Sequence, residues 1–175
     1  ITDTILTTSL SSNDNDDASI IKNALAGMSI IGHTVGTTYD KILYKASLIG
    51  QLTVDNFKPK KLSLSLMEEA KTYFVNAIIQ ELTSQGLLLE SSNNVIITDI
   101  ANDGTVLYEV HVYSDMSNEA SAAITNIDMA LSETSTLASI SEAVQTESSS
   151  SSVSSALSLS ITNNTQIGTT GLVMT

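Results

Sequence analysis

Two β-prone runs joined by a short turn occupy Val95 to Tyr113, which reads VIITDIANDGTVLYEVHVY. The runs Val95–Ile100 and Val106–Tyr113 are rich in β-branched and aromatic side chains, which favour strands. Asn102-Asp103-Gly104 lies between them and supplies residue types that accept a positive φ in a tight turn. This stretch predicts an antiparallel hairpin of two strands.

On the N-terminal side of this hairpin, the sequence predicts a strand followed by a helix. From Tyr44 to Val54 apolar and polar residues largely alternate, which is the period of a half-buried strand. Ser65-Leu66-Met67-Glu68 has the spacing of a capping box, in which Ser and Glu satisfy amides of the first helical turn. The helix behind it is expected to end at Gly86. Its apolar stripe consists of Leu66, Ala70, Phe74, Ala77, Ile78 and Leu82.

On the C-terminal side, the sequence predicts a second amphipathic helix and a last strand. Apolar residues recur at helical spacing from Ala120 to Leu131, and Ser117 is the expected cap. Leu137, Ile140 and Val144 indicate a further short helical piece. Between Val153 and Ile161 apolar residues alternate with Ser, which predicts the last strand.

The order of these elements from Tyr44 to Thr162 is strand, helix, strand, strand, helix, strand. This order predicts an α+β fold of the ferredoxin-like βαββαβ kind, with one antiparallel sheet and the helices on one face. The helical and strand periods together predict which side chains pack between helices and sheet. These are Phe74, Ile78, Leu82, Val95, Ile97, Val106, Tyr108, Val110, Ile124 and Ile127.

Residues 44–162 are expected to form this domain, and three further segments flank it. Residues 1–17 are predicted to be an extended N-terminal arm, and residues 163–175 an extended C-terminal arm. Residues 18–43 are predicted to contain a helix and a linker, because apolar residues recur there at helical spacing. Those residues are Ile20, Ile21, Ala24, Leu25, Met28 and Ile31.

The two arms have the composition of segments that add a strand to an open sheet edge. Both are β-prone, low in charge and free of Pro. Their aliphatic residues are therefore candidate contacts with another subunit: Ile1, Ile5, Leu6, Leu10, Ile167, Leu172, Val173 and Met174.

Composition excludes several classes of function. The chain has 19 Asp and Glu against 7 Lys and Arg, a net charge of −12, so phosphate backbones and anionic lipid would repel it. We therefore expect no nucleic-acid partner, and no membrane insertion because no apolar run could span a bilayer. The absence of Cys excludes disulfides and thiol chemistry. Because the first residue is Ile1 rather than Met, we expect a removed secretory signal and an extracellular or cell-surface location.

The strand Leu48-Ile49-Gly50-Gln51-Leu52, the helix with Phe74 and Leu82, and the hairpin Asp103–Tyr108 resemble the SEA domain family. These extracellular modules of ferredoxin-like fold occur on mucins and cell-surface receptors, and the resemblance covers about residues 45–162. In the family, a strained Gly–Ser peptide of the hairpin is attacked by the Ser hydroxyl, and the two halves stay associated.

The resemblance places Gly104 and Thr105 at the position of that cleaved peptide. It implies autoproteolysis between them, with the Thr105 hydroxyl as the nucleophile. A simple hairpin turn is the alternative, and the residues favour it, because Asn-Asp-Gly between two β-runs needs no chemistry.

No catalytic motif is found in the sequence. His33 and His111 lie in different predicted elements, and no Gly-x-Ser-x-Gly elbow, Walker loop or Gly-x-Gly-x-x-Gly is present. Asn13–Asp17 has oxygen-bearing side chains like a calcium loop, but it lacks that loop's sixth-position Gly and twelfth-position Glu. We therefore expect no enzymatic activity, no cofactor and no metal, and an acidic linker at residues 13–17.

Two further surface features remain. Lys58, Lys60 and Lys61 form a basic cluster in an acidic chain, either as a solvated loop or as a dock for an acidic patch on a neighbouring copy. Asn163-Asn164-Thr165 is a sequon, so Asn163 is a candidate glycosylation site in a secreted protein.

The sequence thus favours a structural subunit of an extracellular fibre or cell-surface assembly, which polymerises through arms that add strands to neighbouring copies. Its partners would be other copies and possible further surface proteins. The first alternative is a monomeric SEA-like adhesion or spacer module of a larger surface protein, cleaved at Gly104-Thr105. The second is a secreted hydrolase of unrecognised type.

Overall fold

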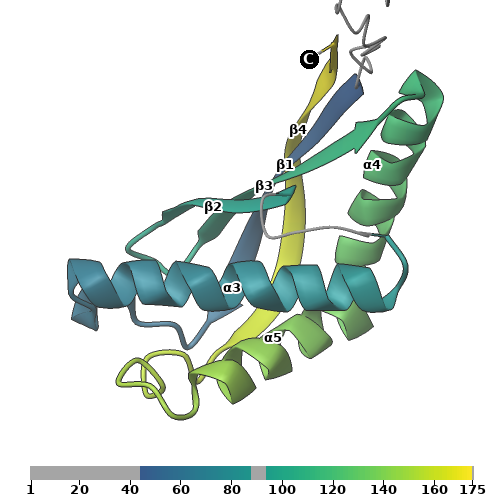
Figure 1. Ribbon diagram of the computed structural model, residues 1–175. Helices are drawn as coiled ribbons and strands as arrows, with labels where there is room; N and C mark the ends of the chain where they lie inside the picture. Colours follow the sequence, from purple (N-terminus) through teal and green to yellow (C-terminus); the bar gives the residue numbers. More distant parts are fainter. Residues whose placement is uncertain (1–43, 88–93, 175) are drawn as a thin grey trace, which may run out of the picture. The chain divides into compact units, whose positions relative to one another are not determined.

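The computed structural model describes residues 44–87 and 94–174, which form an α+β fold with a four-stranded antiparallel sheet and three helices (Figure 1). The predicted N-terminal arm and helix, residues 1–43, lie outside the described residues. The elements in chain order are β1 (Tyr44–Asp55), the 3-10 turn η1 (Pro59–Lys61), α3 (Leu64–Ser84), β2 (Val95–Ile100), β3 (Val106–Ser114), α4 (Ser117–Leu131), α5 (Thr134–Ser148) and β4 (Ser160–Met174).

The strands lie in the order β2-β3-β1-β4, so β1 and β3 are central. In the register of β1 and β3, Leu48 lies opposite Val110 and Leu52 opposite Val106, and all four are fully buried. Partners directly opposite share a face of the sheet, because side chains alternate along a strand. The helices pack against this apolar face, as the alternation in the sequence predicts.

All ten residues predicted for the core are buried, which confirms the periodicity argument. Phe74 of α3 is fully buried, and its ring centroid lies 5.8 Å from that of Phe57, which follows β1. Among the described residues, no helix combines the length and apolar character needed to cross a bilayer.

The cap of α3 differs from the prediction. Ser63, not Ser65, is the N-cap residue, and its hydroxyl accepts a hydrogen bond from the Leu66 amide at 3.4 Å. Ser65 is already inside the helix and shares a side-chain hydrogen bond with Ser63. Both serines are followed by helix-forming residues, so the sequence spacing alone does not distinguish them.

Two full helices, α4 and α5, follow β3 where the sequence predicts one helix and a short piece. α5 has 15 residues, and its buried face includes the predicted Leu137, Ile140 and Val144. Ser117 is the first residue of α4 rather than its cap, and the Ser114 hydroxyl instead accepts a hydrogen bond from the Met116 amide at 3.1 Å.

The last strand begins at Ser160, so the strand predicted at Val153–Ile161 is placed too early in the chain. Val153 and Leu157 are buried, but successive turns rather than a strand hold them, with the Leu157 amide bonded to the Val153 carbonyl at 3.1 Å. The boundary expected after Thr162 lies inside β4, and residues 163–174 pair with β1 of the same chain rather than leaving the domain as an arm.

Candidate functional site

Among the described residues, the sheet has two edge strands, β2 and β4. They differ in how well they are protected against pairing with a strand of another chain. Among the described residues, β2 pairs only with β3, and β4 pairs only with β1. An edge strand presents unpaired backbone groups, which natural proteins usually protect with charge, bulges or short length. The two edge strands differ in which of these protections they carry.

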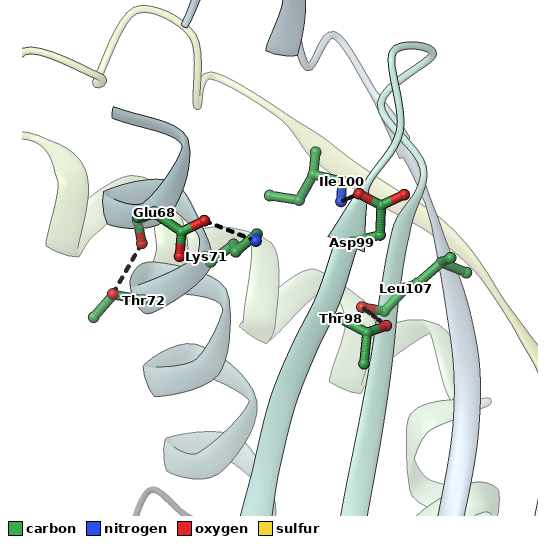
Figure 2. Close-up of polar contacts among 7 residues, drawn as sticks. All are labelled: Glu68, Lys71, Thr72, Thr98, Asp99, Ile100 and Leu107. Carbon is green, nitrogen blue, oxygen red and sulfur yellow. Dashed lines mark hydrogen bonds and ion pairs between the residues drawn. The ribbon is translucent and has the colours of Figure 1, made fainter. Parts of the chain in front are cut away.

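The β2 edge carries all three protections. It is six residues long, and its register with β3 shifts between Ile97 and Asp99. Figure 2 shows the Asp99 carboxylate accepting the Ile100 amide at 2.9 Å and the Thr98 hydroxyl donating to the Leu107 carbonyl at 3.3 Å. Thr98 is the extra residue of the bulge, and the charged Asp99 beside it makes this edge a poor template for another strand.

The helix beside β2 also presents charge. On the first turns of α3, Lys71 Nζ lies 2.8 Å from Glu68 Oε1, and the Thr72 hydroxyl donates to the Glu68 carbonyl at 3.0 Å (Figure 2). Since α3 packs on β2, a strand arriving at this edge would meet a charged surface.

The β4 edge lacks charge entirely. Its fifteen residues read SITNNTQIGTTGLVM and contain no Asp, Glu, Lys, Arg or Pro. Most of its side chains between Thr162 and Thr170 are exposed. In Figure 1, β4 runs along the side of β1 away from β3 and ends at the C-terminus. This is the longer of the two edges, and unlike β2 it carries no charged side chain.

The start of β4 is fixed to α5 by side chains. Ser141 Oγ, which is buried, donates to the Leu137 carbonyl at 2.7 Å and accepts the Ile161 amide at 2.9 Å. Gln145 Nε2 donates to the Leu159 carbonyl at 2.7 Å. These contacts fix the start of β4, and pairing with β1 continues from there through residues 163–174.

A tyrosine crosses the sheet to reach β4. The Tyr108 hydroxyl donates to Asn164 Oδ1 at 2.9 Å, and burial raises the pKa of Tyr108 although the bond to Asn164 opposes that rise. The phenol therefore remains a protonated donor at physiological pH. Asn164 Nδ2 is buried and has no hydrogen-bond partner among the described residues.

Three bulges distinguish β4 from its partner. The register shifts between Lys45 and Ser47, between Ile49 and Gly50, and between Thr53 and Val54, and each shift adds a residue to β4. These extra residues account for the fifteen residues of β4 against the twelve of β1. Bulges bend an edge strand, so regular pairing with a further strand is confined to the runs between them.

The predicted contact and glycosylation residues fall on β4 or outside the described part. Ile167 is the extra residue of the middle bulge and is 56% exposed. Asn163 is exposed, and its Nδ2 donates to Thr165 Oγ1 at 3.3 Å. Leu172, Val173 and Met174 lie in the last part of β4. Ile1, Ile5, Leu6 and Leu10 lie outside the described residues.

The Gly104-Thr105 peptide lies in the β2–β3 turn. Gly104 has φ +96, a conformation that favours glycine, and a Cβ there would lie 3.1 Å from the Val54 carbonyl oxygen. Asp103 Oδ1 accepts the Thr105 amide at 2.9 Å, and this bond with that of the Thr105 side chain lowers the pKa of Asp103. A side-chain oxygen bonded two residues on is an Asx-turn, an ordinary way to build such a loop.

His111 lies beside Ser47 and Glu109 but not in the geometry of a catalytic triad. Ser47 Oγ shares a hydrogen bond of 2.8 Å with His111 Nδ1, and Glu109 Oε1 lies 3.6 Å from the same nitrogen. A triad uses the two ring nitrogens for different partners and keeps the hydroxyl accessible, whereas Ser47 is buried.

Burial lowers the pKa of His111, and the nearby Glu109 carboxylate opposes this. Only 6% of the surface of His111 is accessible to solvent. The neighbouring Ser47 comes from a strand more than sixty positions away in the chain, so no local pattern could reveal this buried pair.

The basic cluster lies where β1 ends. Lys58, Lys60 and Lys61 are exposed, whereas Phe57 before them and Pro59 among them are buried. The Lys61 amide donates to the Lys58 carbonyl at 3.1 Å, which closes the η1 turn. The three ammonium groups are therefore held on a turn that is anchored in the core.

The described part of the chain offers little that would bind a small ligand or a metal ion. No three of its His, Asp and Glu side chains gather as metal ligands would. One broad hollow beside α5 is lined by Ser141, Gln145, Ser149, Leu159 and Ser160, and it is wide open to solvent. Ligand pockets normally enclose most of their ligand's surface, which this hollow does not.

Comparison of the chain with protein-family models, with curated proteins and with solved structures gives no match. The candidate site is therefore defined by geometry and composition alone. It consists of the β4 edge and the basic turn that follows β1.

Proposed function

We propose that this protein is a structural subunit of an extracellular fibre or cell-surface assembly, in which copies join by strand addition at the β4 edge. The observation that carries the proposal is β4 itself: fifteen uncharged residues at the edge of the sheet, paired on one side only among the described residues. The donor is residues 1–12, a β-prone segment with the aliphatic residues Ile1, Ile5, Leu6 and Leu10.

Strand addition suits the composition of both partners. Backbone hydrogen bonds form without regard to the exact side chains, which fits segments rich in Ser and Thr. Burying three aliphatic side chains of the arm contributes about 5 kcal/mol, which offsets part of the entropy lost when the arm is ordered. Because the net charge of −12 makes copies repel each other, backbone pairing and apolar burial are the main attractive forces.

The proposal includes the finer fold and the location. The ferredoxin-like arrangement is supported by the order of elements and by the central place of β1 and β3. The second helix between β3 and β4 departs from the six-element pattern. An extracellular location agrees with the sequon at Asn163, which is exposed on β4. The alternative is a monomeric adhesion or spacer module.

The test measures the mass of the full chain by size-exclusion chromatography with light scattering over a hundredfold range of concentration. We expect assemblies that grow with concentration, and monomers of unchanged circular dichroism when residues 1–12 are deleted. A chain that stays monomeric throughout contradicts the proposal and favours the spacer module.

A matched pair of edge variants locates the contact. Ile167 on β4 and Ile96 on β2 are both exposed isoleucines, 56% and 43% accessible, one on each edge strand. Lys at an edge discourages pairing. We expect Ile167→Lys to reduce assembly and Ile96→Lys to leave it unchanged, and the reverse result would move the contact to β2.

A further inference from the structure

We infer that the acidic run Asn13–Asp17 of one copy docks on Lys58, Lys60 and Lys61 of the next, which fixes the incoming arm antiparallel to β4. The inference rests on the proposed function and specifies its direction and its charged contact. Its starting point is that the chain has one basic cluster among the described residues and one dense acidic run directly after the arm.

The position of the lysines selects the end of β4 where the acidic run must lie. Asp55, the last residue of β1, pairs with Ser160, the first residue of β4, and Lys58 follows three positions later. The opposite end of the two strands, where Tyr44 pairs with Met174, carries the single lysine Lys45 within the described part of β1 and β4. The stronger positive charge therefore lies beside the start of β4.

The direction of the arm follows from this position. If the arm runs antiparallel to β4, residue 1 lies near Met174 and residue 12 near Ser160, so Asp14, Asp16 and Asp17 emerge beside the lysines. A parallel arm would bring the three aspartates to the other end. The antiparallel ladder is also slightly the more stable of the two.

The lengths agree with this direction. Residues 1–12 in a strand span about 40 Å at roughly 3.3 Å per residue. β1, against which β4 is paired from end to end, also has twelve residues. Residues 1–12 can therefore reach from the Met174 end to the Ser160 end while pairing in the runs between the bulges, which places the acidic run just past Ser160 beside the η1 turn.

The carboxylates near these lysines leave the three ammonium groups available to an incoming acidic segment. Two carboxylates of the same chain are near, Asp55 at the end of β1 and Asp103 in the β2–β3 turn. The Asp103 carboxylate interacts mainly with Thr105. Of the interactions that lower the pKa of Asp103, the one with Lys60 is the weakest. Each exposed ion pair contributes little, so the three lysines must act together to favour one direction of the arm.

The test exchanges the charges in the full chain. One variant carries Lys58→Glu, Lys60→Glu and Lys61→Glu, the second carries Asp14→Lys, Asp16→Lys and Asp17→Lys, and a third carries all six changes. We expect the first two to assemble about tenfold more weakly than the native chain when each is alone. An equal mixture of the two, and the third variant alone, should recover native assembly.

The outcomes separate the two levels of the proposal. If the native chain does not assemble, the proposed function itself fails. If it assembles and both charge variants assemble equally well, the proposed function stands and the charged contact is wrong. If the six-change variant recovers but the mixture does not, the arm pairs within its own chain, which overturns docking between copies.

Cross-linking tests the direction independently, because the chain contains no Cys. A chain with Ser12→Cys is mixed with a chain carrying Ser160→Cys or, as the matched control, Thr170→Cys, both exposed positions of β4. Disulfides need Cα atoms within about 7 Å. We expect the Ser12–Ser160 pair to cross-link, and preferential cross-linking to position 170 would show a parallel arm.

Discussion

The ring of Tyr108 on β3 lies directly over Gly50 on β1. A methyl group on Gly50 would come within 2.3 Å of the Cζ and hydroxyl oxygen of Tyr108. The absence of a side chain at Gly50 is what lets the phenol cross the central strand and donate to Asn164 on β4. Gly50 on β1 thus allows a hydrogen bond that links β3 to β4 across the strand between them.

Gly50→Ala should destabilise the protein by about 1–3 kcal/mol, the usual effect of forcing extra volume into a packed site. Tyr108 is fully buried and bonded to Asn164, so its ring has no free space to move into. Gly168→Ala is the matched control on β4, because a Cβ there meets nothing within 4 Å. Urea denaturation measures both variants, and equal free energies of unfolding would contradict the close contact.

Phe74→Ala should lower the free energy of unfolding by about 3–5 kcal/mol, because it removes a fully buried ring and leaves a cavity. Leu64→Ala on the same helix is the control, since Leu64 is 88% exposed and should cost less than about 0.5 kcal/mol. A loss below about 1 kcal/mol for Phe74→Ala would place its ring outside the core.

Much of the core could be predicted from sequence because its signals are local. Phe74, Ile78 and Leu82 repeat at helical spacing, and Val106, Tyr108 and Val110 repeat at strand spacing. Such periods show which face of a helix or strand is buried, and they can be recognised within a short stretch of sequence. The role of Gly50 has a weaker signal, since a glycine within a strand indicates only that some backbone or ligand approaches closely.

Because His111 is buried, the protein should lose stability as the pH falls. Its pKa in the folded protein is below the ordinary 6.5, mainly because of burial, so the unfolded chain takes up a proton first. The free energy of unfolding should be highest above about pH 6.5, and it should decrease as the pH falls from there through the folded pKa. Thermal or urea unfolding between pH 8 and 5 measures this slope.

The control for this prediction is His111→Gln, which should flatten the slope between pH 7 and 5. His33 is present in both proteins, so its contribution cancels in the comparison. Glu69 and Asp103 have pKa values below the ordinary 4.5 and 3.8, because of hydrogen bonds with Ser151 and Thr105, and act at lower pH. An unchanged slope in His111→Gln would show that His111 is not the titrating group.

The Gly104–Thr105 peptide should be intact in nearly all molecules. The turn is already satisfied by the bond from the Thr105 amide to Asp103 and by the glycine conformation of residue 104. Mass spectrometry of the denatured protein checks this, since cleavage would give fragments 1–104 and 105–175. Dominant fragments that disappear in Thr105→Ala would instead establish autoproteolysis.

β4 could not be placed from sequence because the interactions that make it a strand come from residues far away in the chain. Residues 163–170 are Asn, Thr, Gln, Ile and Gly without apolar alternation, whereas apolar residues alternate with Ser from Leu157 to Ile161. The polar run becomes a strand because β1 offers it a full set of backbone partners, from Asp55 opposite Ser160 to Tyr44 opposite Met174. Its bulges and anchors, such as Ser141 to Ile161, likewise depend on the folded neighbours.

The pairing of β1 with β4 also sets an order of events when the chain is synthesised. β1, α3, β2 and β3 leave the ribosome well before β4, at about 5–20 residues per second. For an interval on the order of ten seconds, β1 has its β3 partner on one side and an unfilled edge on the other. During that interval the edge of β1 is open to other segments, and the three-bulge register of β4 disfavours any segment of a different sequence as the partner of β1.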